Sequence, residues 1–488
     1  MGIVFKQSLS NTVITYLGFG IGAINTLFLY TRFLTDEYYG LVGVILSTSA
    51  ILMPLLAFGV PNTLVKYYSG FKQDQNLQGF LGMMLLLPMA MILPIAMLSF
   101  AANQAIGAFL SRENPIVEGY VWHIFLIGMA MAYFEVFYAW SRVHMRTVTG
   151  NFMKEVFVRA GVSVMLFLVY LDLISVPLFL DLLVALYLVR TLIMKWYAYR
   201  LKRPSLRFLW PKNSRPILTY SLLIILGGSA AVILLELDRF MINQFIPIEN
   251  VAYYSVAVFI ATVVAVPTRA MHQVTYPLTA ELLNKKDTAG LKELYHKSSV
   301  TLLVVSGLLF LLIILNVQDL YLLLPETYRG GFMVVFLVGL AKVYDALLGN
   351  NNSILYNSEY YRAVLVMGVF LALLTILLNL WFIPVLGING AALATFLAIS
   401  IYNTVKMWYV KVKFGIHPLG GDTYKILVMI TALGLLLYWV PLNFHPILNM
   451  LLKSTVLVSF YLWLIFRFQL SPEIIEGLRW LYRLGKKS

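Results

Sequence analysis

The chain has 488 residues, of which 60% are hydrophobic and 12% charged, and its formal net charge is +14. Soluble domains are about 45–50% apolar and about 25% charged, so this composition argues against a soluble protein. The chain has no cysteine, which excludes disulfides, iron–sulfur clusters and cysteine-ligated zinc sites. The six histidines are scattered without metal-ligand spacing, so we expect no metal site and no cofactor.

Apolar stretches long enough to cross a membrane follow one another from Leu9 to Phe468. A helix needs roughly 20 apolar residues to cross the hydrocarbon core, so we predict an all-α polytopic membrane protein with about 14 transmembrane helices. Their approximate bounds are about 9–34, 40–68, 78–102, 117–142, 151–171, 176–200, 215–246, 250–278, 293–316, 331–356, 361–383, 388–412, 423–441 and 446–467.

Lysine and arginine collect in every second gap between these stretches. The basic gaps lie near Lys66 and Lys72, near Arg142, Arg146 and Lys154, at Lys195–Arg215, at Lys285–Lys297, at Lys406–Lys413 and after Arg467. The alternate gaps hold only Arg32, Arg112 and Arg329. Because cytoplasmic loops retain their basic residues, we predict that both termini lie in the cytoplasm. The positive charge then faces anionic lipid headgroups, and we expect no nucleic acid partner.

The longest polar interruption is the basic connector Lys195–Arg215, which contains no acidic residue. It predicts a division into two six-helix lobes followed by two more helices, with domains at 1–208, 209–415 and 416–488. Both lobes contain a similar motif at the start of their second helix, Tyr38-Tyr39-Gly40 in one and Tyr253-Tyr254-Ser255 in the other. Equivalent helices would run in the same direction, which indicates a parallel repeat. After Phe468, apolar and basic residues recur at helical spacing and predict an amphipathic helix on the inner leaflet.

Five segments, in this order and spacing, resemble the polysaccharide-export branch of the multidrug/oligosaccharidyl-lipid/polysaccharide (MOP) exporter superfamily, the Wzx-type flippases. The segments are LTDEYYGL at 34–41, FGVPNTLVKY at 58–67, LDRF at 237–240 with VAYYSVA at 251–257, LPETY at 324–328, and LGINGAALAT at 386–395. The resemblance implies twelve core helices in two lobes, often with two more at the C-terminus.

It also implies a function. Such a protein would move a polyprenyl-diphosphate-linked oligosaccharide from the cytoplasmic to the outer leaflet of a bacterial inner membrane, for surface polysaccharide or O-antigen (lipopolysaccharide) biosynthesis. The expected partners are the lipid-linked oligosaccharide, membrane lipids, and a polymerase with other polysaccharide-assembly proteins. We expect a monomer that is a transporter and not an enzyme, so no catalytic residue is predicted.

Ionisable and amide side chains within apolar stretches are the candidates for substrate contact, because each is costly to insert in a membrane. On the first helix, residues from Asn11 through Asn25 to Arg32 form one polar and small-residue stripe. We expect the stripe to line a hydrated cavity between the lobes, with packing against a neighbouring helix as the alternative. On the eighth helix, Arg269 and Gln273 share a face, and the alternative for Arg269 is a pair with an acid such as Glu135.

Two further helices each place an acid and a base close together. Asp238 and Arg239 lie near Glu236, and Lys342 lies three residues before Asp345. We assign Arg239 and Lys342 to the substrate site and consider Glu135, Asp238 and Asp345 for ion coupling, while local pairing at i, i+3 remains open. For Glu155 and Arg159, at i, i+4, we favour a local salt bridge.

The expected substrate explains the preference for arginine. A diphosphate carries about two negative charges and cannot cross hydrocarbon uncompensated. Arginine presents a planar fork that matches phosphate oxygens and keeps its charge at any relevant pH. Two lobes rocking about such a site would give alternating access.

Three alternatives remain. A cation-coupled multidrug (MATE-like) exporter would share the fold but typically carries an acid in the first helix, and residues 9–34 contain none. A lipid II flippase would share both the fold and the cationic site. A membrane glycosyltransferase or polymerase usually needs a large extracytoplasmic loop, and every alternate gap here is short. The chain also lacks the glycine-rich phosphate loop of nucleotide-binding proteins.

Overall fold

The computed structural model describes residues 3–71, 77–204, 214–225, 230–440 and 442–476. All regular secondary structure in these ranges is helical, which confirms the predicted all-α class. The chain divides into two compact units, residues 1–255 and 256–488. The three-part division at 208/209 and 415/416 stays a prediction.

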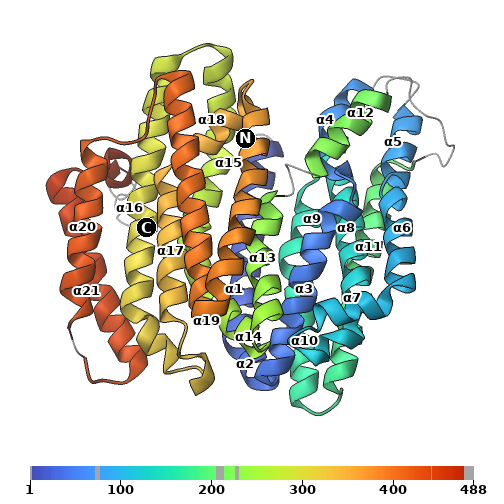
Figure 1. Ribbon diagram of the computed structural model, residues 1–488. Helices are drawn as coiled ribbons and strands as arrows, with labels where there is room; N and C mark the ends of the chain where they lie inside the picture. The colour runs from blue at the N-terminus through green and yellow to red at the C-terminus, as the bar shows by residue number, and fades with distance from the viewer. Residues whose placement is uncertain (1–2, 72–76, 205–213, 226–229, 441, 477–488) are drawn as a thin grey trace. The chain divides into compact units, whose positions relative to one another are not determined.

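Unit 1 contains the helices drawn from blue to green in Figure 1. Their bounds are α1 Ile3–Ile24, α2 Tyr30–Phe33, α3 Asp36–Leu56, α4 Val60–Phe71, α5 Leu77–Leu86, α6 Met89–Ala101, α7 Asn103–Leu110, α8 Val121–Val143, α9 Val148–Phe152, α10 Val158–Tyr170, α11 Val176–Leu201, α12 Ser214–Leu223 and α13 Ala230–Phe245. The helix α14, Glu249–Thr262, begins in this unit. Each of the first seven predicted membrane segments therefore falls on one or more consecutive helices.

The second predicted segment is interrupted near its middle. Helix α3 starts at the N-cap Thr35, whose hydroxyl accepts from the Tyr38 amide, and it ends at Leu56. Phe58 and Gly59 then adopt positive φ angles of 51° and 64° before α4 begins. A Cβ at Gly59 would overlap the carbonyl oxygen of Ser221 on α12, so this position requires glycine both for its φ and for the close approach.

Helix α1 packs against α9 and α10 along the stripe that the sequence singles out. Gly18 lies against the backbone of Glu155, and Gly22 lies against the side chain of Arg159. Asn25 is buried, donates to the Arg159 carbonyl oxygen at 2.8 Å and accepts from the Ser163 hydroxyl at 2.6 Å. Between Gly18 and Asn25 the stripe is thus a packing face, which was the alternative to a cavity lining.

The turn between α13 and α14 is held by the buried Asn114 amide. Its Nδ2 donates to the Asn243 carbonyl at 2.8 Å and to the Ile246 carbonyl at 3.1 Å, while its Oδ1 accepts from the Ile248 amide at 2.9 Å. Gly40 on α3 approaches the Ile248 carbonyl so closely that a Cβ would overlap it. We call Asn114, Asn243 and Ile248 the amide latch.

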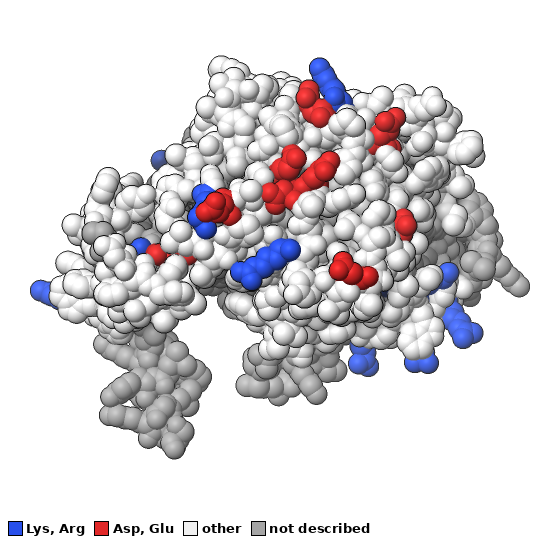
Figure 2. Space-filling view, turned by 90° about the horizontal axis from the view of Figure 1, so that it is seen from below, with Lys and Arg blue, Asp and Glu red and all other residues white. Residues whose placement is uncertain are grey.

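The two ends of unit 1 differ in charge. In Figure 1 the lower end holds the turns between α2 and α3 and between α10 and α11, while α4 and α12 lie at the upper end. The lower turns carry acidic residues such as Asp36, Glu37 and Asp172. Figure 2 views the molecule from below and shows several acidic side chains away from any basic side chain. The charge asymmetry predicted from the alternate gaps is therefore present in the folded unit.

Unit 2 contains the rest of the chain. Its helices are the remainder of α14, α15 Val266–Asn284, α16 Thr288–Tyr321, α17 Phe332–Leu347, α18 Asn351–Asn357, α19 Tyr361–Phe414, α20 Gly421–Tyr438 and α21 Pro446–Phe468. Helix α19 covers two predicted segments, since Gly387 has a non-helical φ of 57° and ψ of −136° inside it. Helices α17 and α18 form one predicted segment that bends by 58°.

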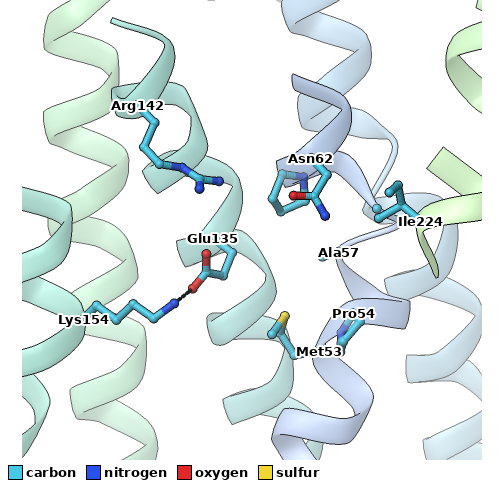
Figure 3. Close-up of a pocket in the computed structure, with 10 residues that line it drawn as sticks. Met53, Pro54, Ala57, Asn62, Glu135, Arg142, Lys154 and Ile224 are labelled. Atoms are coloured by element: carbon cyan, nitrogen blue, oxygen red, sulfur yellow. Dashed lines mark hydrogen bonds and ion pairs between the residues drawn. The ribbon is translucent and has the colours of Figure 1, made fainter. Parts of the chain in front are cut away.

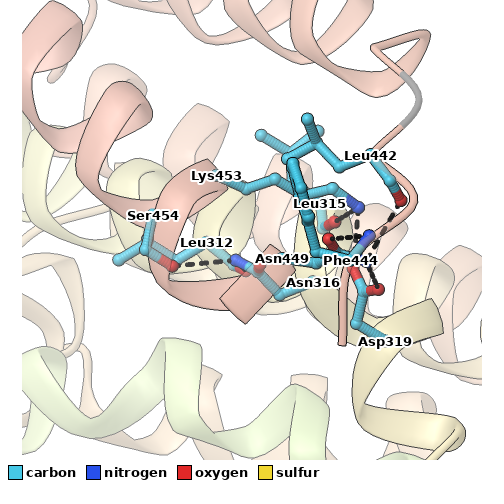
Figure 4. A network of polar contacts seen from close by, with 9 residues as sticks. All are labelled: Leu312, Leu315, Asn316, Asp319, Leu442, Phe444, Asn449, Lys453 and Ser454. Atoms are coloured by element: carbon cyan, nitrogen blue, oxygen red, sulfur yellow. Dashed lines mark hydrogen bonds and ion pairs between the residues drawn. The ribbon is translucent and has the colours of Figure 1, made fainter. Parts of the chain in front are cut away.

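Both of the last two helices pack against α16, and α21 does so through a polar network (Figure 4). The buried Asp319 accepts from Lys453 Nζ at 2.7 Å and from Asn449 Nδ2 at 2.9 Å. One turn away, Asn316 donates to the Ser454 hydroxyl at 3.1 Å. Through these hydrogen bonds and the Lys453–Asp319 ion pair, the network fixes α21 on α16 despite its apolar surroundings.

Ten helices among the described residues are long and apolar enough to cross a membrane, or up to eleven if the bent α17 and α18 pair is one span. This finding supports a multi-pass membrane protein, whereas the number fourteen and the orientation stay predictions. Most of the predicted amphipathic tail lies in 477–488, outside the described residues. The same holds for the middle of the basic connector, 205–213.

Candidate functional site

The break between α3 and α4 borders a pocket of about 220 Å³ in unit 1 (Figure 3). Helices α3, α4, α8 and the segment after α12 contribute to it, together with a π-helical turn at Met153–Phe157. Its lining residues are Met53, Pro54, Ala57, Gly59, Pro61, Asn62, Glu135, Arg142, Lys154 and Ile224. The pocket therefore combines apolar and proline residues of a broken helix with three charged side chains.

The charged residues of the pocket have a net positive charge. Lys154 Nζ lies 2.6 Å from Glu135 Oε1, and the two side chains are 45% and 19% exposed, respectively. Arg142 is two helical turns beyond Glu135 on α8 and extends into the same space in Figure 3. Its buried Nε has no hydrogen-bond partner among the described residues. One cation is thus neutralised within the pocket, and the other remains available to an anion.

The sequence identified Glu135 but did not assign Arg142 or Lys154 to the site. From the sequence, both belong to the basic gap that follows an apolar stretch. The available signal was the i, i+7 spacing of Glu135 and Arg142, which places both on one face of a helix. Nothing local in the sequence indicates that Lys154 reaches across to Glu135.

Two other predicted site residues of unit 1 lie apart from this pocket. Arg32 is exposed in the last turn of α2, near the acidic end of the unit. Asn25 is enclosed by α10, as described above, and does not line the pocket. The assignment of these two residues to a substrate stays a prediction.

Asp238 and Arg239 are neighbours on α13 with separate partners. Arg239 pairs with Glu236 at 2.6 Å and its Nε donates to the Ser255 hydroxyl at 2.9 Å. Asp238 is buried and accepts a hydrogen bond from the Tyr254 hydroxyl. The local pair of Glu236 and Arg239 is confirmed, as is the pair of Glu155 and Arg159, whose atoms lie 2.8 Å apart.

In unit 2, Arg269 and Gln273 lie one turn apart on α15, and both are exposed. Arg269 has no hydrogen bond or ion pair with another described residue of this unit. A guanidinium in an apolar span needs compensation for its charge, so an unpaired one is suited to contact an anion. The predicted pairing partner, Glu135, is bridged to Lys154 instead.

The other predicted residues of unit 2 lie on α17. Lys342 and Asp345 are both partly buried, and Asp345 accepts from Asn403 Nδ2 on α19 at 3.4 Å. Near them, Lys406 of α19 is only 1% exposed and donates to Asn352 Oδ1 at 2.9 Å. Its ammonium also lies 4.3 Å from the centre of the Tyr402 ring. We call Asp345, Asn352, Asn403 and Lys406 the buried cluster.

Lys406 lies on a helix, two turns before the end of α19 at Phe414, in agreement with the predicted span of about 388–412. The placement of the basic run Lys406–Lys413 on the cytoplasmic side stays a prediction. Among the described residues no group of three or more histidine, aspartate or glutamate side chains is placed to hold a metal ion.

Comparisons with known proteins agree with this architecture. The sequence profile of the family described as "Polysaccharide biosynthesis protein" matches residues 4–283. No curated protein matches the chain in sequence.

Solved structures of membrane transporters resemble the chain. The first is "Lipid II flippase MurJ, inward closed conformation", with a TM-score of 0.69 and 14% identity, covering 93% of this chain and 99% of that one. An inward-facing multidrug resistance MATE family transporter of the MOP superfamily has a TM-score of 0.64 and 13% identity, covering 83% and 94%. A MOP superfamily transporter from Pyrococcus furiosus has a TM-score of 0.56 and 12% identity, covering 85% and 96%. At these identities the likeness establishes the fold alone.

The family match covers more than half of the chain, and the helical fold is the one found in MOP superfamily transporters. Both findings agree with the resemblance predicted from the sequence segments. The chain belongs to the polysaccharide biosynthesis protein family.

Proposed function

We propose that the protein is a flippase that moves a polyprenyl-diphosphate-linked oligosaccharide from the cytoplasmic to the outer leaflet of a bacterial inner membrane. The product serves surface polysaccharide biosynthesis, with O-antigen as the expected class. The observation that carries this proposal is the pocket at the α3–α4 break, where Arg142 has an unpartnered Nε in a chain of this family. The proposed activity makes and breaks no covalent bond.

The pocket suits a phosphate in both charge and geometry. A lipid-linked diphosphate brings about two negative charges into a region where they need compensation. The Arg142 guanidinium offers parallel N–H donors, and Lys154 offers a point charge that is now used by Glu135. Arg269, Gln273 and Lys342 of unit 2 and Arg32 and Arg239 of unit 1 are the further candidates for the headgroup's path.

Ion coupling would act through the Glu135–Lys154 pair. Protonation of Glu135 would remove the negative charge that holds Lys154, and Lys154 could then bind a phosphate oxygen. The exchange links proton binding to substrate binding in one pocket. Asp238 and Asp345 are the other candidates for coupling, but each accepts hydrogen bonds from neutral neighbours, Tyr254 and Asn403.

Alternating access requires contacts that close the substrate path on one side of the membrane and that can break when the path opens. The amide latch at the acidic end of unit 1 is such a set, because its hydrogen bonds join segments that are far apart in the sequence. Hydrogen bonds of this kind contribute about 0.5–1.5 kcal/mol each, so a substrate that favours the open form could reverse them. The orientation predicted from the basic gaps makes this end the outer one.

The test is export in cells that depend on this protein. We expect Arg269→Ala and Arg32→Ala each to abolish surface polysaccharide while the protein still inserts in the membrane, and Arg269→Lys to retain activity only if charge alone is needed. Arg329→Ala is the matched control, because Arg329 forms an exposed pair with Glu326. Wild-type export by both Arg269→Ala and Arg32→Ala would remove these residues from the substrate path.

A second assay distinguishes the function classes. Purified protein in liposomes should move a fluorescent polyprenyl-diphosphate sugar between leaflets, and Glu135→Gln should weaken the response to an imposed pH gradient. Rescue of cells depleted of their lipid II flippase would favour that activity instead. Raised drug tolerance without lipid movement would favour a multidrug exporter, and sugar transfer by the purified protein would favour an enzyme.

A further inference from the structure

A second cleft lies at the basic end of α11, away from the pocket of Figure 3. It has a volume of about 480 Å³ and is lined by Leu192, Lys195, Trp196, Tyr199, Arg200 and Arg203. These residues are spaced at three or four along one face of the helix, so a single helix face builds most of the cleft. No part of the proposed flippase function uses it.

The cleft is cationic without an acidic counterpart. It contains one lysine and two arginines, and none of them forms a hydrogen bond or ion pair with another described residue. Two of the three cations contact aromatic rings instead. The Arg200 guanidinium lies 3.8 Å from the Trp196 ring centre, and Lys195 Nζ lies 5.7 Å from the Tyr199 ring centre. Such cation–π contacts orient the charges and leave their outer N–H groups open to a ligand.

The apolar part of the cleft points to a lipid. Leu192 and Trp196 are 61% and 56% exposed at the end of an apolar helix that is long enough to cross a membrane. A tryptophan followed by basic residues at the end of an apolar helix is typical of the membrane–water interface, where the hydrocarbon core gives way to the headgroups. A soluble anion would use the cations but not the exposed leucine and indole, whereas a phospholipid uses both.

We propose that this cleft binds the headgroup of an anionic phospholipid, with the acyl chains lying along Leu192 and Trp196. The phosphate contacts Arg200 and Arg203, and Lys195 lies one turn deeper, beside the glycerol backbone. The bound lipid would fix the end of α11 where the basic connector begins. This proposal does not depend on which substrate the protein transports.

The experiment measures lipid binding to the purified full-length protein in detergent by native mass spectrometry. Phosphatidylglycerol is the probe, with phosphatidylcholine and inorganic phosphate as comparison arms. Each basic residue near an anionic lipid contributes roughly fivefold in affinity, so Arg200→Gln/Arg203→Gln should weaken phosphatidylglycerol binding by about twentyfold. Trp196→Ala should weaken it while keeping the charge, and phosphatidylcholine and inorganic phosphate should bind weakly to every variant.

The matched control is Lys411→Gln/Lys413→Gln, which removes the same charge from two exposed positions at the end of α19. An equal loss in this control would mean that net charge alone attracts lipid, which overturns the proposal. Wild-type affinity in the Arg200/Arg203 variant, or equal competition by inorganic phosphate, would overturn it as well.

Displacement by polyprenyl diphosphate at matched concentration would assign the cleft to the substrate and would also overturn the proposal. A monodisperse elution profile for each variant ensures that binding is compared between folded proteins.

Discussion

The pocket of unit 1 and the buried cluster of unit 2 both contain a lysine beside a helix break, but the two lysines have different surroundings. Lys154 is 45% exposed and pairs with a carboxylate at the edge of an open pocket. Lys406 is 1% exposed and donates to the neutral amide of Asn352 next to the bend between α17 and α18. A charge that borders open space can exchange its partner for a ligand, whereas an enclosed charge mainly orders the helices around it.

The helix breaks themselves arise in different ways. In unit 1, Pro54, Pro61 and the positive φ of Gly59 interrupt the α3–α4 span. In unit 2, Gly349 has a φ of 52°, and the amides of Asn350 and Asn351 donate hydrogen bonds near the bend. Asn350 donates to Thr279 at 2.8 Å and Asn351 donates to Tyr295 at 2.6 Å. Buried side-chain hydrogen bonds thus hold the second break, whereas a pocket lined by Arg142 and Lys154 lies beside the first.

Among the variants that test this comparison, we expect the largest effect, a loss of folded protein, at Lys406. Lys406→Glu places a second acid near Asp345 in an enclosed site, and an uncompensated buried charge costs about 3–5 kcal/mol. We expect most of the variant protein to be lost from the membrane, as measured by the folded fraction in size-exclusion chromatography. Lys406→Met keeps the stem and removes the charge, so it should remain folded. If Lys406→Glu is as stable as the wild type, the cluster is open to water.

A smaller effect, on export and not on stability, is expected at Arg142. Arg142→Ala removes a charged hydrogen-bond donor worth about 1.5–3 kcal/mol, so export should fall by roughly tenfold to a hundredfold. The thermal unfolding midpoint should stay close to that of the wild type, because Arg142 Nε has no hydrogen-bond partner among the described residues and its cation–π contact with Tyr138 is long, at 5.2 Å from the ring centre. Arg146→Ala, at an exposed position four residues later, is the control. Equal losses in both variants would point to a general effect of positive charge.

The smallest effect is expected at the amide latch, which resembles the buried cluster in using amides to hold helices. The cysteine-free chain allows a single reporter, Val251→Cys, which is buried against Gly43. Asn114→Ala removes hydrogen bonds worth about 0.5–1.5 kcal/mol each, so labelling of this cysteine by an impermeant maleimide should rise severalfold. Asn250→Ala loses only a local bond to Pro247 and should label like the reporter alone. No difference between the two variants would mean that the latch does not control this opening.

The sequence by itself determined the helical class, the order of the apolar spans, the charge asymmetry of their ends and the resemblance to a polysaccharide transporter family. It also predicted the pair Glu155–Arg159 correctly and left the pair Glu236–Arg239 as an open alternative that the structure contains, because in each case both partners lie within about one turn of helix. These properties are local, and hydropathy, loop charge and i, i+3 or i, i+4 spacing are sufficient to predict them.

Only the tertiary structure decided which charges are open and which are enclosed. Lys154 forms an ion pair with Glu135 of α8, and Asn25 donates a hydrogen bond to the Arg159 carbonyl of α10. Lys406 donates to Asn352, which lies more than fifty positions away in the sequence. Such contacts depend on where helices break and how they pack. The spacing of apolar and polar residues shows which face of a helix is polar, but it does not show which other helix packs against that face. The stripe of α1 between Gly18 and Asn25 and the single residue Lys406 of α19 are therefore enclosed by packing that their own sequence does not reveal.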